Sequence, residues 1–155
     1  MTPAELCGTH SRIAFDSHVF IYLFEAAPQR GPIARALVLE AELRGIRLVA
    51  STVAVAETAV GPVRQGDEAM AVRYADAMRS IGNLDIVPVS AEIALDAAVY
   101  RGRLRIALTD AIHLATARAA GATVLVTNDR RLPPVPHVEI VVLDDLELDE
   151  GATAR

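Results

Sequence analysis

Short apolar runs alternate along the chain with longer segments in which apolar residues recur at helical spacing. The short runs predict strands at residues 13–15, 47–50, 85–89, 123–127 and 138–143. The longer segments predict helices at residues 19–24, 31–44, 52–60, 67–81, 90–100 and 111–120. Strands and helices that alternate in this way are typical of an α/β domain, with a mostly parallel central sheet and helices on both faces.

Glycine, proline and capping residues set the expected ends of these helices. Gly61 and Pro62 are expected to break the third helix, because proline has no N–H to donate and its ring crowds the preceding turn. Thr109 or Asp110 is expected to cap the last helix at its N-terminus, and Gly121 is expected to close it.

Length and charge indicate one folded unit. The 155 residues match the usual size of a single domain, and no repeat, linker or low-complexity segment divides them. We expect one domain over residues 12–146, an N-terminal extension over residues 1–11 and an acidic C-terminal tail over residues 147–155. Five of the 20 acidic residues fall between positions 144 and 150, so the rest of the chain is almost neutral.

The composition excludes several classes of protein. The 15 strongly basic residues are all arginine, which excludes a Walker phosphate loop and Schiff-base chemistry because both need lysine. No apolar run approaches the roughly 18 residues of a spanning helix, and the first residues lack the features of a signal peptide. We therefore expect a cytoplasmic protein without membrane contact. The single cysteine, Cys7, cannot form an internal disulfide.

Four acidic residues stand where the predicted fold would bring them together. Asp16 and Asp129 each follow an apolar strand directly. Glu57 lies alone on an otherwise apolar helix, and Asp110 begins another. Open parallel sheets bind ligands beyond the carboxyl ends of their strands. Carboxylates that converge there without a lysine repel one another, and a divalent cation would relieve that repulsion.

The donor chemistry of these acids favours Mg²⁺ or Mn²⁺ over Zn²⁺, since only carboxylate oxygens are offered. Such ions activate water and hold the oxygens of a phosphodiester during in-line displacement, so hydrolysis of a nucleic acid is the leading interpretation. Each acid alone also has a simpler interpretation. Asp16 and Asp129 suit strand-end turns, Asp110 suits a helix cap, and Glu57 suits a solvated helix face.

Four short segments surround the acids in a fixed order. They are Asp-Ser-His-Val-Phe-Ile-Tyr from residue 16, Val-Ala-Glu from 55, Thr-Asp-Ala-Ile-His-Leu-Ala-Thr-Ala from 109 and Val-Thr-Asn-Asp-Arg-Arg-Leu from 126. Together they resemble the motifs of PIN-domain ribonucleases, in particular the VapC toxins of prokaryotic toxin–antitoxin pairs. The resemblance extends from about Arg12 to Leu146 and leaves the role of both chain ends open.

The resemblance implies a parallel sheet covered by helices and an endoribonuclease that depends on Mg²⁺ or Mn²⁺. The catalytic, metal-binding acids of the family match four residues here, namely Asp16, Glu57, Asp110 and Asp129. Thr127 matches the hydroxyl residue that supports the site, and Ser17 is a second supporting candidate. The resemblance also implies an antitoxin partner whose tail lies over the acids.

Four arginines lie close to the acids in the sequence. They either contact RNA phosphates or belong to the ordinary surface, and they are Arg103, Arg105, Arg130 and Arg131. His113 is expected to pack in the core rather than bind metal. The hydrophobic fraction of 52% predicts a homodimer through the helices near residues 22–44.

Several alternative functions differ in class from a toxin ribonuclease. One is a catalytically silent interaction module with the same fold, and another is a nuclease of this kind without an antitoxin. A flap-type DNA nuclease would share the acids, but the long basic insertions of those enzymes are absent from the sequence. A nucleotide-binding domain is disfavoured because the glycines form no G-x-G-x-x-G motif.

Overall fold

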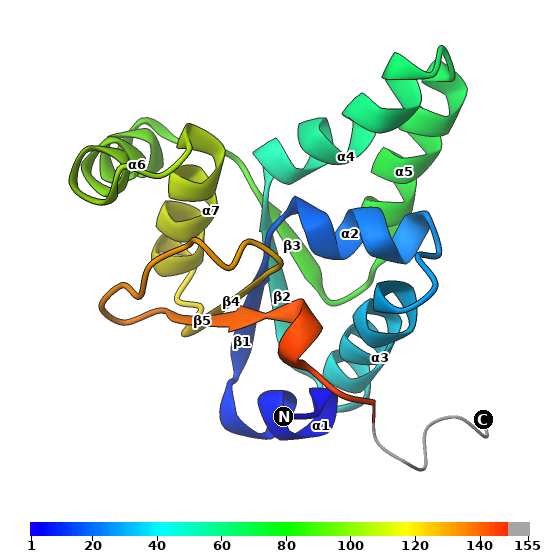
Figure 1. Cartoon of the computed structure of the whole chain (residues 1–155), viewed down its shortest axis with the longest axis horizontal. Coiled ribbons are helices and arrows are strands. Elements are labelled where there is room, and N and C mark those ends of the chain that lie inside the picture. The colour runs from blue at the N-terminus through cyan, green and yellow to red at the C-terminus, as the bar shows by residue number, and fades with distance from the viewer. Residues whose placement is uncertain (149–155) are drawn as a thin grey trace.

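In the computed structural model, which describes residues 1–148, helices surround one central sheet (Figure 1). The strands are β1 (Arg12–Phe15), β2 (Arg47–Ser51), β3 (Leu84–Val87), β4 (Val124–Thr127) and β5 (Glu139–Val142). The helices are α1 (Pro3–Thr9), α2 (Ser17–Phe24), α3 (Arg30–Leu43), α4 (Thr52–Arg64), α5 (Glu68–Ser80), α6 (Ala91–Leu104), α7 (Leu108–Ala119) and the short 3-10 helix η1 (Leu143–Asp145).

The sheet has the order β3-β2-β1-β4-β5, and all four neighbouring pairs are parallel. The chain builds outward from β1 through β2 to β3, and then returns to add β4 and β5 on the other side of β1. The direction of winding therefore reverses between β1 and β4, which is where open α/β sheets form their ligand crevice. The expected α/β fold around a parallel sheet is confirmed.

The central strands β1, β2 and β4 are buried on both faces because alternate side chains enter two separate cores. Ile13, Phe15 and Leu48 face the core that contains α2 and α3. Ala14 and Val49 face the opposite core, which α7 covers. Figure 1 shows α2 to α5 on one side of the sheet and α7 on the other, with α6 packed outside α7. Helices therefore cover both faces, as the sequence predicts.

The break expected at Gly61 and Pro62 is wrong, because α4 continues through both residues to Arg64. Proline normally clashes with the Cβ of the residue before it, and Gly61 has no Cβ. The missing N–H removes one hydrogen bond only, and the buried Pro62 ring packs in the interior. The helix then ends within one turn, so the cost is confined to its last residues.

The predicted boundaries of α6 and α7 also need correction. The helix expected to end near Tyr100 continues to Leu104 and stops where Arg105 adopts a left-handed backbone with φ of 55°. The last helix has Ala107 at its cap position and no side-chain cap, so neither Thr109 nor Asp110 caps it. Asp110 instead lies in its first turn. Gly121 follows the helix at φ of 73°, as expected.

The N-terminal residues 1–11 contain a helix that the sequence pattern did not predict. Thr2 caps α1 reciprocally with Glu5, which satisfies two of its free N–H groups. Leu6 and Cys7 are buried in the same core as α3. At the other end, Leu146 is also buried, and residues 149–155 of the acidic tail lie outside the described part of the chain. Within residues 1–148, no helix has the length and apolar character required to span a membrane.

Candidate active site

Asp16 lies at the end of β1, beside the end of β4. Its Oδ1 accepts a hydrogen bond from the His18 backbone N–H at 2.9 Å, so it caps α2. Its Oδ2 accepts the Thr127 hydroxyl at 2.5 Å and contacts His18 Nδ1 at 2.9 Å. The pairing of Phe15 with Val126 places the two strand ends side by side. Asp16 is only 3% exposed, so these contacts fix its carboxylate.

Asp129 is tied to Asp16 through Thr127. The Thr127 hydroxyl oxygen, which donates to Asp16, accepts the backbone N–H of Asp129 at 3.0 Å. The Asp129 carboxylate also forms a bidentate ion pair with Arg131, with Oδ1–Nε and Oδ2–Nη2 distances of 2.9 and 2.8 Å. Hydrogen bonds from the side chain and backbone of Arg131 hold the pKa of Asp129 below its usual range. The Thr127 hydroxyl therefore bridges Asp16 and Asp129.

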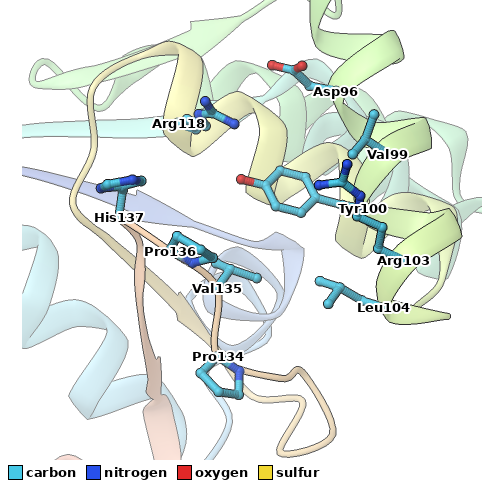
Figure 2. Close-up of a pocket in the computed structure, with 10 residues that line it drawn as sticks. All are labelled: Asp96, Val99, Tyr100, Arg103, Leu104, Arg118, Pro134, Val135, Pro136 and His137. Carbon is cyan, nitrogen blue, oxygen red and sulfur yellow. The ribbon is translucent and has the colours of Figure 1, made fainter.

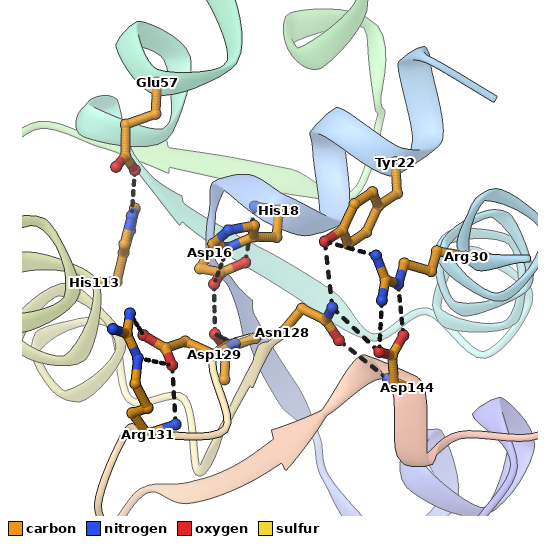
Figure 3. Close-up of polar contacts among 11 residues, drawn as sticks. Asp16, His18, Tyr22, Arg30, Glu57, His113, Asn128, Asp129, Arg131 and Asp144 are labelled. Atoms are coloured by element: carbon orange, nitrogen blue, oxygen red, sulfur yellow. Dashed lines mark hydrogen bonds and ion pairs between the residues drawn. The ribbon is translucent and has the colours of Figure 1, made fainter. Parts of the chain in front are cut away.

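Glu57 reaches the site from α4 and contacts α7. Its Oε2 lies 2.8 Å from His113 Nε2, which is the donor because a carboxylate only accepts (Figure 3). Burial raises the pKa of Glu57, but the His113 hydrogen bond and weaker ones from Ser17 and Thr109 outweigh burial and leave that pKa lowered. His113 is buried, as expected. Its bond to Glu57 was not foreseen.

Asp110 links the acids electrostatically. Burial raises its pKa, and the negative charges of Asp129, Asp16 and Glu57 raise that pKa further, against the opposing effect of His113. The four acids thus act on one another across the crevice between β1 and β4. The N-terminal turn of α7, where Asp110 lies, offers partial positive charge that favours a carboxylate. The pKa of Asp110 is nevertheless raised, so this partial charge does not offset the effects of burial and of the neighbouring acids.

The acids fit a divalent cation by their chemistry. Within residues 1–148, no three His, Cys, Asp or Glu side chains lie close enough to hold an ion as they stand. Asp16, Glu57 and Asp129 are each engaged with a histidine or an arginine (Figure 3). The donors are oxygens, and the raised pKa of Asp110 indicates negative charge without full compensation. The Arg131 side chain is 90% exposed, so it can turn away from Asp129 without disturbing the core.

The four candidate arginines occupy different positions around the acids. Arg105 and Arg131 line the same depression as Asp129, with a volume of about 250 Å³. Arg130 points elsewhere and forms an ion pair with Asp145 in η1, with an Nη2–Oδ1 distance of 2.6 Å. Arg103 lies in a separate pocket beside α6. The structure therefore brings two of the four next to the acids.

A polar network that the sequence did not reveal secures the loop before Asp129. Arg30 forms a bidentate ion pair with Asp144 at 2.7 and 2.8 Å, and its guanidinium lies over the Tyr22 ring at 5.0 Å from carbon to centroid. Asn128 donates to the Tyr22 hydroxyl at 3.2 Å and accepts the Asp144 backbone N–H at 3.3 Å (Figure 3). Part of the acidic segment after position 143 is thus bound to the domain.

Replacing Asp144 with asparagine is expected to lower the melting temperature by a few degrees at neutral pH. The Arg30 hydrogen bond holds the pKa of Asp144 below its usual range, so the pair stabilises the fold above the unfolded-state pKa. That contribution is lost as pH falls through the lower folded-state pKa. Thermal melts from pH 7 to pH 2 should therefore converge for the two proteins. Asp76→Asn, which breaks an exposed pair with Arg79, is the control. A difference that stays constant with pH would contradict this explanation.

Comparison with known proteins identifies the family. The profile of the PIN domain matches residues 13–138, a range that contains all four acids. The chain belongs to the PIN domain family. A comparison of this PIN domain with curated proteins finds no match.

Several solved structures are similar to this PIN domain. One is VapBC2 of Rickettsia felis bound to a fragment of promoter DNA, with 19% identity, a TM-score of 0.65 and coverage of 84% of this chain and 98% of that chain. Another is a toxin–antitoxin complex of Klebsiella pneumoniae, with 22% identity, a TM-score of 0.57 and coverage of 81% and 94%. A third is Mycobacterium tuberculosis VapC20, a toxin that cleaves the sarcin–ricin loop, with 19% identity, a TM-score of 0.59 and coverage of 73% and 86%. At these identities the likeness establishes a shared fold.

Proposed function

We propose that this PIN domain is an endoribonuclease that hydrolyses RNA phosphodiester bonds with Mg²⁺ or Mn²⁺, and that it is the toxin of a toxin–antitoxin pair. The observations that carry the proposal are the position of Asp16 and Asp129 at the switch point of the sheet and the charges of Asp16, Glu57 and Asp129 that act on Asp110. The similar structures support RNA as the substrate, since one of them is a toxin that cleaves the sarcin–ricin loop.

The roles of the residues follow from their contacts. The ion would be held by Asp16, Glu57, Asp110 and Asp129. When bound, such an ion polarises the phosphodiester and lowers the pKa of the attacking water. Thr127 keeps Asp16 and Asp129 in register, and His113 orients Glu57. Arg131 releases Asp129 and turns its guanidinium toward a phosphate oxygen, with Arg105 beside it.

The proposed activity is tested by incubating the purified protein with total RNA and with tRNA, in Mn²⁺, in Mg²⁺ or in EDTA. Discrete cleavage products are expected with either ion and none in EDTA. Cleavage that persists in EDTA would rule out the metal-dependent reaction. An absence of cleavage under all conditions would favour a silent module that keeps the PIN fold.

Replacing Thr127 with valine is expected to slow RNA cleavage by roughly 10- to 100-fold, the usual effect of losing a group that orients metal ligands. Valine keeps the shape of the side chain but removes the hydroxyl that holds Asp16 and Asp129 together. Initial rates at saturating Mn²⁺ measure the effect. Thr127→Ser restores the hydroxyl and should recover most of the activity. Equal rates for the valine variant and the wild type would remove Thr127 from the site.

A homodimer through α3 is expected because that helix presents large apolar side chains to solvent. Leu43 is 82% exposed and Leu39 on the same helix is 50% exposed. Apolar side chains adjacent on one helix face are typical of an interface. Light scattering should give twice the mass of one chain, and Leu43→Asp should halve it. Leu95→Asp on α6, which is similarly exposed, is the control. A monomeric wild type would contradict this assembly.

An antitoxin is the second proposed partner. The pKa of Asp110 is raised by burial and by the other acids, and the chain has no lysine, so a basic side chain from another protein would bind there and block the reaction. Antitoxin complexes among the similar structures support this proposal. A solitary nuclease of the family would lack such an inhibitor.

A further inference from the structure

A second concave site lies between α6, the end of α7 and the loop that leads into β5 (Figure 2). Its volume is about 270 Å³, close to the lower end of the roughly 300–1,000 Å³ typical of small-ligand sites. Tyr100 and Arg103 enter it from α6, Arg118 from α7 and His137 from the loop. A site of this size holds a single compact group.

The pocket adjoins the candidate active site. Leu104 forms part of its wall and also lines the depression that contains Asp129 and Arg131. Pro134 and Leu132, two residues apart in one loop, line the pocket and the depression respectively. A strand held at the acids can therefore continue along the end of α6 into the pocket.

The lining of the pocket matches the two halves of a nucleotide. Tyr100 offers an aromatic ring, and the prolines at 134 and 136 add apolar surface, which suits a stacked base. Arg103 and Arg118 offer two guanidinium groups, and Asp96 is the one acid among the lining residues. Arginine binds phosphate oxygens with paired N–H groups. A peptide would need backbone partners, whereas ring and guanidinium groups suit an unpaired nucleotide.

The loop at the pocket holds a strained residue. An antiparallel bridge between Val135 and Val138 closes a tight turn. Within it His137 has φ of 70°, a left-handed conformation that glycine adopts at much lower cost. The turn places the imidazole of His137 at the pocket wall (Figure 2). The imidazole therefore forms part of the pocket wall, together with the groups supplied by α6 and α7.

We propose that this pocket binds one unpaired nucleotide of the RNA substrate, next to the phosphodiester held at the acids. The base stacks on Tyr100 against the proline loop, and its phosphate contacts Arg103 and Arg118. The inference rests on the proposed ribonuclease function and adds a site that selects unpaired RNA. It explains how a nearly neutral domain could choose its substrate without a large basic surface.

Binding to a non-cleaving form of the full chain tests the pocket. The Asp110→Asn protein is titrated into a fluorescent single-stranded RNA of about 12 nucleotides, a length within the range of single-strand sites. Adding Tyr100→Ala should weaken binding by about 5- to 100-fold, as loss of one stacked base does. Tyr100→Phe should bind nearly as the parent. Arg103→Ala should bind more weakly and with a smaller salt dependence. The matched control is Arg73→Ala on α5, on the far side of the domain.

A second variant separates binding from folding. His137→Gly should raise the melting temperature, because it relieves the left-handed backbone, and should still weaken RNA binding. If His137 had only a structural role, the variant would melt at a higher temperature but would bind RNA as the parent does. The proposal is overturned if Tyr100→Ala and Arg103→Ala bind like the Arg73 control, or if the parent binds no RNA. It is also overturned if these variants lose only an antitoxin, since the pocket would then serve a protein.

The two proposals fail in distinguishable ways. A wild type that does not cut RNA, combined with variants that lose binding specifically, would remove the ribonuclease function and keep a nucleotide site. A wild type that cuts RNA, combined with variants that bind and cut as it does, would remove the pocket alone.

Discussion

Asp110→Asn is expected to reduce RNA cleavage by more than about 100-fold, beyond the 10- to 100-fold loss caused by groups that only orient metal ligands. Asparagine keeps the size of the side chain and one oxygen donor but removes the negative charge that favours a hard cation. Asp16→Asn should have a similar effect. Single-turnover rates in Mn²⁺ give the comparison. Both variants cutting RNA at the wild-type rate would contradict the assignment of these acids.

The same substitution is expected to stabilise the fold at neutral pH. Burial and the neighbouring acids raise the pKa of Asp110 in the folded state, so its ionised form opposes folding. The penalty is absent below the unfolded-state pKa and grows as pH rises through the folded-state pKa. Asp110→Asn should therefore melt at a higher temperature than the wild type at pH 7 and at the same temperature near pH 3. Glu68→Gln, in the first turn of α5, is the control for loss of a helix-terminal charge.

The second large effect concerns the helix that Asp16 caps. Phe20→Ala is expected to destabilise the domain by about 3–5 kcal/mol, the usual loss for a buried phenylalanine. Phe20 is fully buried in α2, and its ring lies 5.8 Å from the ring of Phe15, centroid to centroid, in an edge-to-face arrangement. Its removal leaves a cavity between α2 and β1, the two elements that meet at Asp16. Denaturant unfolding measures the change.

A matched surface substitution sets the baseline for this effect. Val72→Ala removes apolar atoms from a residue that is 60% exposed on α5 and should change stability by less than about 0.5 kcal/mol. If Phe20→Ala is equally mild, α2 is not anchored by this packing. Restored packing in Phe20→Leu should recover part of the lost stability.

The sheet and the acids could be predicted from the sequence because each depends on local signals. A strand buried on both faces is a continuous apolar run, as at residues 13–15, and the chain must turn where that run ends. A charged residue at such a turn, as at Asp16, therefore marks the crevice. The parallel order then brings the ends of β1 and β4 together, which no single segment reveals but which the alternation of strands and helices requires.

The remaining features depend on contacts between distant residues. Nothing near Arg30 in the sequence points to Asp144, and nothing near Glu57 points to His113. Local rules also misled at Pro62, where the preceding glycine has no Cβ to clash with the ring and the helix ends two residues later. The pocket beside α6 was missed because its walls come from two helices and a loop that lie apart in the sequence.

Calorimetric titration of Mn²⁺ tests most directly the central claim that four acids form one cation site. The wild type is expected to bind Mn²⁺, and each of four single substitutions should weaken that binding by about tenfold or more. They are Asp16→Asn, Glu57→Gln, Asp110→Asn and Asp129→Asn. Because the four acids lie on separate elements, a similar loss of Mn²⁺ affinity in all four variants would indicate that they share one ion. Wild-type affinity retained in all four variants would contradict the account.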